Sequence, residues 1–121
     1  MEEKRTIGPR ARRQVDRALR RSQAAVSAIT FWEVGLLAAR KRIALDIPLD
    51  RWRREALGLG FSEVALTGDI AVAGAELGGF HADPTDRLIV ATAQMMAATL
   101  LTADERILEW QGSLARQDAR V

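Results

Sequence analysis

Short apolar runs alternate with longer amphipathic segments along this chain of 121 residues. The apolar runs predict buried strands at residues 24–29, 63–66 and 99–101, and a weak edge strand around residues 114–116. The amphipathic segments predict helices at residues 9–21, 31–40, 51–59, 67–77 and 84–98, and a turn with a short helix in 102–109. Residues 1–7 are polar and are expected to be frayed. Strands that alternate with helices predict an α/β fold with a parallel sheet.

Polar residues at the predicted helix starts support these boundaries. Asp83 precedes Pro84, which fits an N-cap residue followed by proline in the first helical position. Asp50 is expected to cap the helix at 51–59, and Thr67 is expected to begin the helix that ends near Leu77.

The composition excludes several kinds of chemistry. Cysteine is absent, so disulfides, thiol catalysis and cysteine-ligated metals are excluded. One histidine, His81, is too few for a histidine-rich metal site and for most Ser-His-Asp schemes. No apolar run approaches the roughly 20 residues that cross a bilayer, and no secretory leader pattern is present. Any chemistry is therefore expected from carboxylates, hydroxyls and arginine.

Charge is unevenly distributed although the formal net charge is only +2. Residues 1–21 carry eight basic and three acidic side chains, and almost all basic residues of the chain are arginine. Arginine suits bidentate recognition of phosphate and carboxylate. The basic segment could therefore serve a nucleic acid or an acidic partner, but composition alone favours the solvated face of a helix.

Acidic residues follow the predicted strands or begin the helices near them. In a parallel sheet, ligand sites lie outside the carboxyl ends of the strands, so these acids could converge there. Carboxylates held together repel one another unless one is protonated or a cation neutralises them, and oxygen ligands favour Mg²⁺ or Mn²⁺. The candidates are Glu33, Asp86 and Asp104, with Asp83 and Thr102 as auxiliary groups.

Each candidate also has a purely structural interpretation, which spacing alone favours. Thr30 and Glu33 have the spacing of a capping box, in which Glu33 bonds the backbone of Thr30. Asp83 and Asp86 suit the N-terminus of a helix, and Asp104 suits a turn.

Four further residues are interpreted structurally. His81 is expected to be a loop histidine rather than a ligand, and Met95 and Met96 are expected to pack in the core. Trp32 is expected in the core or at a dimer interface rather than as a platform for stacking bases.

Three stretches, taken together, resemble the PIN-domain ribonucleases and, among them, the VapC-type toxins of bacterial toxin–antitoxin pairs. They are Val26-Ser-Ala-Ile-Thr-Phe-Trp-Glu33-Val, Gly79-Phe-His-Ala-Asp83-Pro-Thr-Asp86-Arg-Leu-Ile-Val-Ala-Thr-Ala93 and Leu100-Leu-Thr-Ala-Asp104-Glu-Arg-Ile107. The middle stretch is the most specific, because an Asp-Pro-x-Asp-Arg start before an apolar, alanine-rich helix is rare by chance. The resemblance covers roughly residue 8 to the end.

The resemblance implies a compact three-layer α/β/α sandwich, with residues 1–121 forming one domain. It implies a cytoplasmic, Mg²⁺- or Mn²⁺-dependent endoribonuclease toxin that forms a homodimer and is masked by an antitoxin. Glu33, Asp86 and Asp104 match the metal-binding acidic residues of the family, and Asp83 and Thr102 match positions beside the site.

The implied reaction is hydrolysis of an RNA phosphodiester bond by water, which leaves 5′-phosphate and 3′-hydroxyl ends. Single-stranded loops are the expected targets because their splayed bases can be reached. Arg87 and Arg106 flank the acidic candidates. They could contact phosphate, although a structural ion pair is the more economical interpretation of either one alone.

One part of the family pattern is missing from this sequence. Family members open with a central strand that ends in an aspartate within a Leu-Asp-Thr-like motif, and residues 7–21 already look like a later helix. Asp16 cannot replace that aspartate, because it lies amid arginines in mid-helix. We therefore expect the first strand and first helix to be absent, through start-site choice, gene damage or deliberate removal.

Two consequences of this absence are expected. The neighbouring strands should have unpaired edges, so the chain should be unstable alone or should pair these edges with another chain. The site should hold its cation weakly, so that nuclease activity is weak or absent. The alternative function is an inactive toxin remnant that serves only as an antitoxin-binding module.

Overall fold

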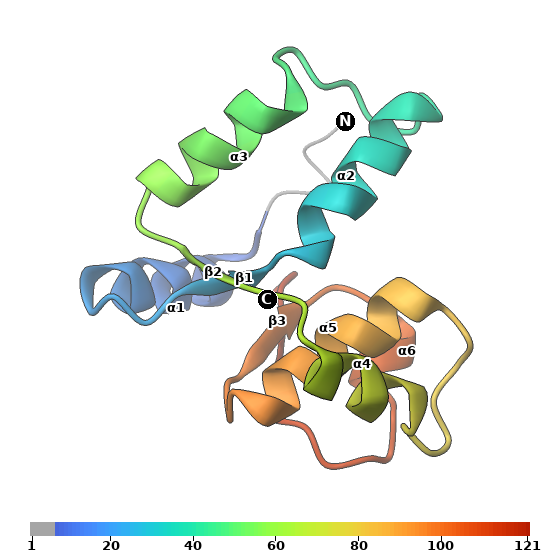
Figure 1. Cartoon of the computed structure of the whole chain (residues 1–121). Helices are drawn as coiled ribbons and strands as arrows, with labels where there is room; N and C mark the ends of the chain where they lie inside the picture. Colours follow the sequence, from blue (N-terminus) through green and yellow to red (C-terminus); the bar gives the residue numbers. More distant parts are fainter. Residues whose placement is uncertain (1–6) are drawn as a thin grey trace.

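Helices and strands alternate along the chain in the computed structural model, which describes residues 7–121 (Figure 1). We expected residues 1–7 to be frayed. Apart from Ile7, this segment lies outside the described residues. The helices are α1 Pro9–Arg20, α2 Ile29–Ala39, α3 Leu49–Gly58, α4 Gly68–Ala75, α5 Pro84–Met95 and α6 Glu105–Leu108. The strands are β1 Ala25–Ser27, β2 Ser62–Val64, β3 Leu100–Thr102 and β4 Arg116–Asp118. The predicted α/β class is confirmed.

The strands form two separate parallel pairs. β1 pairs with β2, with Ala25 opposite Ser62, and β3 pairs with β4, with Leu100 opposite Arg116. Among residues 7–121, no strand joins β1 to β3, so the sheet is divided into two halves.

Helices cover the strands on two sides. Val15 and Ala18 of α1 line one cavity that borders β1 and β3, whereas Ile89 and Ala93 of α5 line another cavity beside the same two strands. The order helix, strand and helix is that of the expected three-layer sandwich. α2 and α3 extend from the β1–β2 half, and α4, α5 and α6 gather around β3 (Figure 1).

The main hydrophobic cluster belongs to the half that contains β3. It is centred on Phe80, Val90 and Ile107, which are at most 8% exposed. Partly buried apolar side chains pack around this centre: Leu77, Leu100, Trp110 and Leu114. α4 packs closely against α5, and a Cβ at Gly74 would lie only 3.3 Å from the Arg87 carbonyl oxygen. This core fixes the start of α5 relative to the end of β3.

Several predicted helix starts are confirmed, but two are wrong, at α3 and at α2, which begins at Ile29 after Ala28. Thr67 and Asp83 are the N-cap residues of α4 and α5, and each side chain accepts a backbone N–H. Asp50 does not cap α3, because that helix begins at Leu49 after Pro48. Asp50 instead pairs with Arg54 one turn later, at 3.0 Å. No helix of residues 7–121 combines the length and the apolar character that a membrane span requires.

Two predictions about the core are wrong. Met95 is 50% exposed and Met96 is 55% exposed, so neither packs in the core. Met96 borders the cavity that β1 and β3 also line. Trp32 is 54% exposed, which excludes the core and leaves the dimer interface of the two expected places for this side chain.

Candidate metal centre

The start of α5 presents Asp86 toward the end of β3. The Asp83 side chain accepts the Asp86 backbone N–H at 3.2 Å, and Pro84 occupies the first turn. This cap holds the backbone of Asp86 in the first turn of α5. Its side chain is only 13% exposed.

The end of β3 presents the second carboxylate. Thr102 Oγ1 accepts the Asp104 backbone N–H at 3.1 Å and so shapes the turn after the strand. Asp104 Oδ1 accepts the backbone N–H groups of Arg106 at 2.8 Å and Ile107 at 3.2 Å, which makes Asp104 the N-cap of α6. The cap uses Oδ1, so Oδ2 is left on the side of Asp86.

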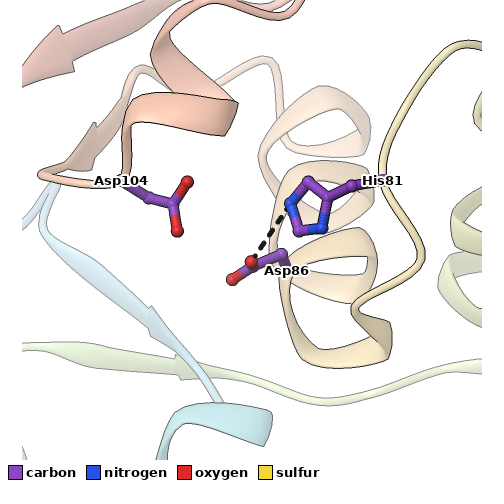
Figure 2. A group of neighbouring side chains, drawn as sticks. All are labelled: His81, Asp86 and Asp104. Atoms are coloured by element: carbon purple, nitrogen blue, oxygen red, sulfur yellow. Dashed lines mark ion pairs between the residues drawn. The ribbon is translucent and has the colours of Figure 1, made fainter.

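Asp86, Asp104 and His81 form a compact group, which Figure 2 shows from the side of the α5 start. One potential ligand atom from each lies within 4.8 Å of the others. Arg106 Nη2 lies 3.4 Å from Oδ2 of both aspartates. A guanidinium between two carboxylates marks the position where positive charge is favoured.

Glu33 lies near this group but outside its most compact part. It borders the same cavity as Asp86 and Thr102, and its side chain comes from α2, which follows β1. Burial raises the pKa of Glu33, and the negative charges of Asp86, Asp83 and Asp104 raise it further. The four carboxyl groups therefore lie close enough for the charges of the three aspartates to affect the ionisation of Glu33.

The capping-box interpretation of Glu33 is wrong. α2 begins at Ile29, one residue earlier than Thr30, and its N-cap Ala28 has no side chain that could accept a hydrogen bond. Ser27 Oγ instead accepts the Ile29 N–H at 3.3 Å. Glu33 is therefore not used to cap the helix.

The pKa values of the two aspartates in the compact group are shifted in opposite directions. Burial raises the pKa of Asp86, as do the charges of Asp83 and Asp104, while His81 and Arg106 partly oppose this rise. Burial also raises the pKa of Asp104, but hydrogen bonds from Ile107 and Arg106 outweigh it and hold that pKa below its ordinary value. The pKa of Asp104 is thus lowered and that of Asp86 is raised, so positive charge placed between them would oppose the rise at Asp86.

His81 is the residue that the sequence did not assign to the site. It lies in the loop before α5, as expected, but its Nε2 is 3.2 Å from Asp86 Oδ2. Its Nδ1 accepts the Asp83 backbone N–H at 3.3 Å, so the neutral ring carries its proton on Nε2. Nε2 is buried and makes no hydrogen bond, because its contact with Asp86 lacks hydrogen-bond geometry, and it is one of the three potential ligand atoms of the compact group. The sequence feature that could have placed His81 near Asp86 is its position two residues before Asp83, the N-cap of α5.

The two flanking arginines have different environments. Arg106 pairs with Asp86 and Asp104, in line with the ion-pair interpretation. Arg87 points away from the carboxylates: Nε donates to the His81 carbonyl at 2.9 Å, and Nη2 donates to the Phe80 carbonyl at 3.0 Å. Its Nη1 donates to the Gly74 and Leu77 carbonyls. These bonds occupy all three nitrogens that a phosphate contact by Arg87 would use, so that expectation is not supported.

The donor set suits a hard divalent cation. Two carboxylates converge, further carboxyl groups add negative charge, and the pKa of Asp86 is raised by that charge. Oxygen ligands of this kind are preferred by Mg²⁺ and Mn²⁺. Asp86 and Asp104, which lie within 4.8 Å of each other and of His81, are the residues that would hold such an ion, and Glu33 adds negative charge from the edge of the same cavity.

Residues 6–111 match the PIN domain family, so the chain belongs to this family. Its similarities lie with PIN domains of the VapC type. Ribonuclease VapC22 of Mycobacterium tuberculosis (strain ATCC 25618 / H37Rv) is 38% identical over 84 residues, which are 69% of this chain and 64% of that protein. The chain thus spans slightly less than two thirds of the length of this curated relative.

A solved structure shares the fold. It is described as a toxin-antitoxin complex from Klebsiella pneumoniae, and its matching chain is 27% identical with a TM-score of 0.56. The match covers 84% of this chain and 80% of that chain. The resemblance to VapC-type PIN domains that the three sequence stretches carry is confirmed.

Proposed function

We propose that this protein is a Mg²⁺- or Mn²⁺-dependent endoribonuclease toxin of a toxin–antitoxin pair. The observation that carries the proposal is the convergence of Asp86 and Asp104 from two distant segments, with the charge of Glu33 nearby. The relatives support the class of activity, since one is a ribonuclease and another belongs to a toxin–antitoxin complex.

In this proposal the residues of the chain have separate tasks. Asp86 and Asp104 hold the cation, and Glu33 adds negative charge or a ligand from the β1 side. A bound divalent cation supplies positive charge beside the scissile phosphate and makes a water molecule more acidic. Water then adds to phosphorus, the bond to the 3′ oxygen breaks, and the 3′ oxygen takes up a proton.

Arg106 is proposed to change partners. Its exposed guanidinium now neutralises Asp86 and Asp104, and a cation held by the same carboxylates would take over that task. Arg106 would then be free to contact an RNA phosphate, for which a guanidinium is well suited. RNA loops, an antitoxin and a second copy of the chain are the proposed partners, and the proposed location is cytoplasmic.

The alternative function, an inactive remnant that only binds antitoxin, is favoured by one observation. Asp86 and Asp104 belong to the half that contains β3, whereas Glu33 belongs to the half that contains β1, and no hydrogen-bonded strand connects the two halves within residues 7–121. A ligand set on two separate supports is held less rigidly than one on a continuous sheet, and a loose ligand set binds a cation weakly.

The experiment compares Asp86→Asn with Asp69→Asn, which changes an acid in the first turn of α4 in the same way. Mn²⁺ binding is measured by calorimetry, and cleavage of a single-stranded RNA is followed with and without Mg²⁺. We expect binding and cleavage to be lost in Asp86→Asn and retained in Asp69→Asn. Binding of antitoxin without any metal-dependent cleavage would favour the remnant, and cleavage that persists without divalent cations would contradict the metal-dependent proposal.

A further inference from the structure

The exposed side of α1 carries four arginines in line, which we call the arginine row. They follow one another at spacings of three or four residues, and all four are exposed: Arg10, Arg13, Arg17 and Arg20. Residues at these spacings lie on one side of a helix, each one turn after the last. The other side of the helix faces the protein, since Ala11 is fully buried. The row therefore points into solvent along the whole length of α1.

α3 shows how exposed arginines are neutralised elsewhere in this chain. All three arginines of that helix are in ion pairs, which are Arg51 with Glu55, Arg54 with Asp50, and Arg53 with Glu63. By contrast, no member of the arginine row is ion-paired with any of residues 7–121. The row thus differs from the ordinary solvated helix face that composition alone favours.

The arginines of the row also repel one another. Arg13 has Arg10 one turn before it and Arg17 one turn after it, and like charges at these spacings destabilise a helix. The first turn of α1 has no acidic side chain that would complement the positive end of the helix dipole, and Asp16 is the one acidic residue of the helix. A polyanion bound along the row would relieve this repulsion.

The start of α1 lies at the edge of the sheet that carries the metal centre. The Gly8 N–H donates to the Ala119 carbonyl at 2.8 Å, and the Ala119 N–H donates to the Thr102 carbonyl at 2.8 Å. The Thr102 side chain in turn accepts the Asp104 N–H. Two backbone hydrogen bonds therefore connect the start of α1 to the end of β3. Arg10, two residues after Gly8, is the member of the row at this end.

From that edge the row leads along the sheet toward the other end of the strands. α1 begins beside the carboxyl end of β3, and a short connection leads from its last residue into the amino end of β1. From Arg10 to Arg20 the row is roughly 15 Å long at about 1.5 Å per residue. A stacked strand of nucleic acid has about one phosphate every 3.4 Å, so the row has the length of about four phosphates.

We propose that the arginine row binds the sugar–phosphate backbone of a single-stranded RNA whose scissile bond lies at the metal centre. This inference rests on the proposed function, because the metal centre would cut the strand that the row holds. Guanidinium groups bind phosphate oxygens through paired N–H groups and stay charged at physiological pH. Phosphate contacts position a strand without selecting its bases, so the row sets the affinity and the path of the RNA but not the sequence that is cut. The continuity of the row with the metal centre favours RNA over an acidic protein segment.

The test measures the binding of an oligouridine of about 12 nucleotides to the full chain by fluorescence anisotropy, without divalent cations and over a series of salt concentrations. Arg13→Gln/Arg20→Gln removes two guanidinium groups from the row. We expect its affinity to fall about tenfold at low salt, and the slope of log K against log salt to become shallower by about 1.4, which is two phosphate contacts at about 0.7 each.

Two matched variants separate contact from charge. Arg40→Gln/Arg42→Gln removes the same charge from two exposed arginines at the end of α2, and we expect the affinity and the slope of the wild type. Arg13→Lys/Arg20→Lys keeps the positive charge of the row, and we expect the salt slope of the wild type. An equal loss in both glutamine variants would show an effect of net charge alone and would overturn the proposal.

Two other outcomes would also overturn it. One is an unchanged affinity and slope in Arg13→Gln/Arg20→Gln. The other is a loss of binding to an oligoglutamate peptide while oligouridine binding is unchanged, which would assign the row to an acidic protein partner.

Cleavage in the presence of Mg²⁺ separates this inference from the proposed function. A chain that cleaves RNA with Mg²⁺, and whose glutamine variant of the row binds RNA as the wild type does, contradicts the role of the row and supports the nuclease. A chain that binds oligouridine through the row but does not cleave it with Mg²⁺ or Mn²⁺ contradicts the nuclease and retains the RNA-binding row.

Discussion

His81 Nε2 lies 3.2 Å from Asp86 Oδ2, while Nδ1 of the same ring accepts the Asp83 backbone N–H. The ring is thus held between the cap of α5 and a carboxylate at the centre of the acidic group (Figure 2). The charge of His81 lowers the pKa of Asp86, and its Nε2 is also one of the three potential ligand atoms of the compact group.

We predict that His81→Asn weakens Mn²⁺ binding mainly in mildly acidic solution. His81 lowers the pKa of Asp86, so without it that pKa rises further and protons compete more strongly with the cation. Calorimetric titrations at about pH 5 and about pH 8 should show a clear loss of affinity at the lower pH and near-equality at the higher pH. An equal loss at both values would instead identify His81 as a ligand.

We predict that Asp86→Asn stabilises the metal-free fold at neutral pH. The pKa of Asp86 in the folded chain is raised, so the folded state binds more protons than the unfolded chain in the window just above the ordinary value of 3.8. The free energy of unfolding therefore falls as the pH rises through this window. Urea unfolding should show Asp86→Asn to be more stable than the wild type at pH 7, with the difference vanishing well below pH 4.

The opposite dependence is predicted for Asp104→Asn. The pKa of Asp104 is lowered on folding, so its contribution to stability is present above the ordinary value of 3.8 and is lost as the pH falls through the lowered pKa. Since asparagine caps a helix about as well as aspartate, the variant should keep the cap of α6 but be less stable than the wild type at neutral pH, with the difference vanishing in acid. A stabilised Asp104→Asn at neutral pH would contradict this interpretation.

Arg87→Met should destabilise the chain by roughly 2–3 kcal/mol, because charged hydrogen bonds to several partly buried carbonyls are lost. Those carbonyls belong to the segment between α4 and α5, so the position of His81 should also be disturbed. Urea unfolding measures the loss of stability, and the matched variant is Arg106→Met at an exposed guanidinium. Equal stability of the two variants would mean that the Arg87 bonds contribute nothing.

Val90→Ala should cost about 2 kcal/mol, since Val90 is fully buried in α5 and its removal leaves a cavity in the core. Val72→Ala makes the same change at a side chain that is 58% exposed and should alter the free energy of unfolding by less than about 0.5 kcal/mol. Thermal and urea unfolding check both values.

Local patterns were sufficient to predict much of the fold. The alternation of apolar runs and amphipathic segments located β1, β2 and β3 to within a few residues, and the predicted edge strand near residue 115 is found at Arg116–Asp118. Asp83 followed by Pro84 predicted the start of α5, because a cap acts through its own first turn. Asp50 was misplaced because Pro48, two residues earlier, begins the helix first.

The sequence predicted which residues belong to the candidate site, but it did not predict the contacts between them. Asp83, Asp86 and Asp104 could be named because residues at the ends of parallel strands and the starts of adjoining helices share one edge of the fold. Arg87 could not be assigned, since the carbonyls that it binds become its neighbours only when α4 packs against α5. Met96 was misjudged for a related reason: helical spacing does not reveal whether a neighbouring element covers the side chain.

The sequence by itself determined the order of helices and strands, the helix caps and the family, because these depend on neighbouring residues and on short motifs. Only the tertiary structure decided that His81 contacts Asp86, that Arg106 joins Asp86 to Asp104, and that β1 and β3 belong to separate pairs. Contacts of this kind join residues far apart in the chain, and they depend on the packing of whole elements rather than on local preference.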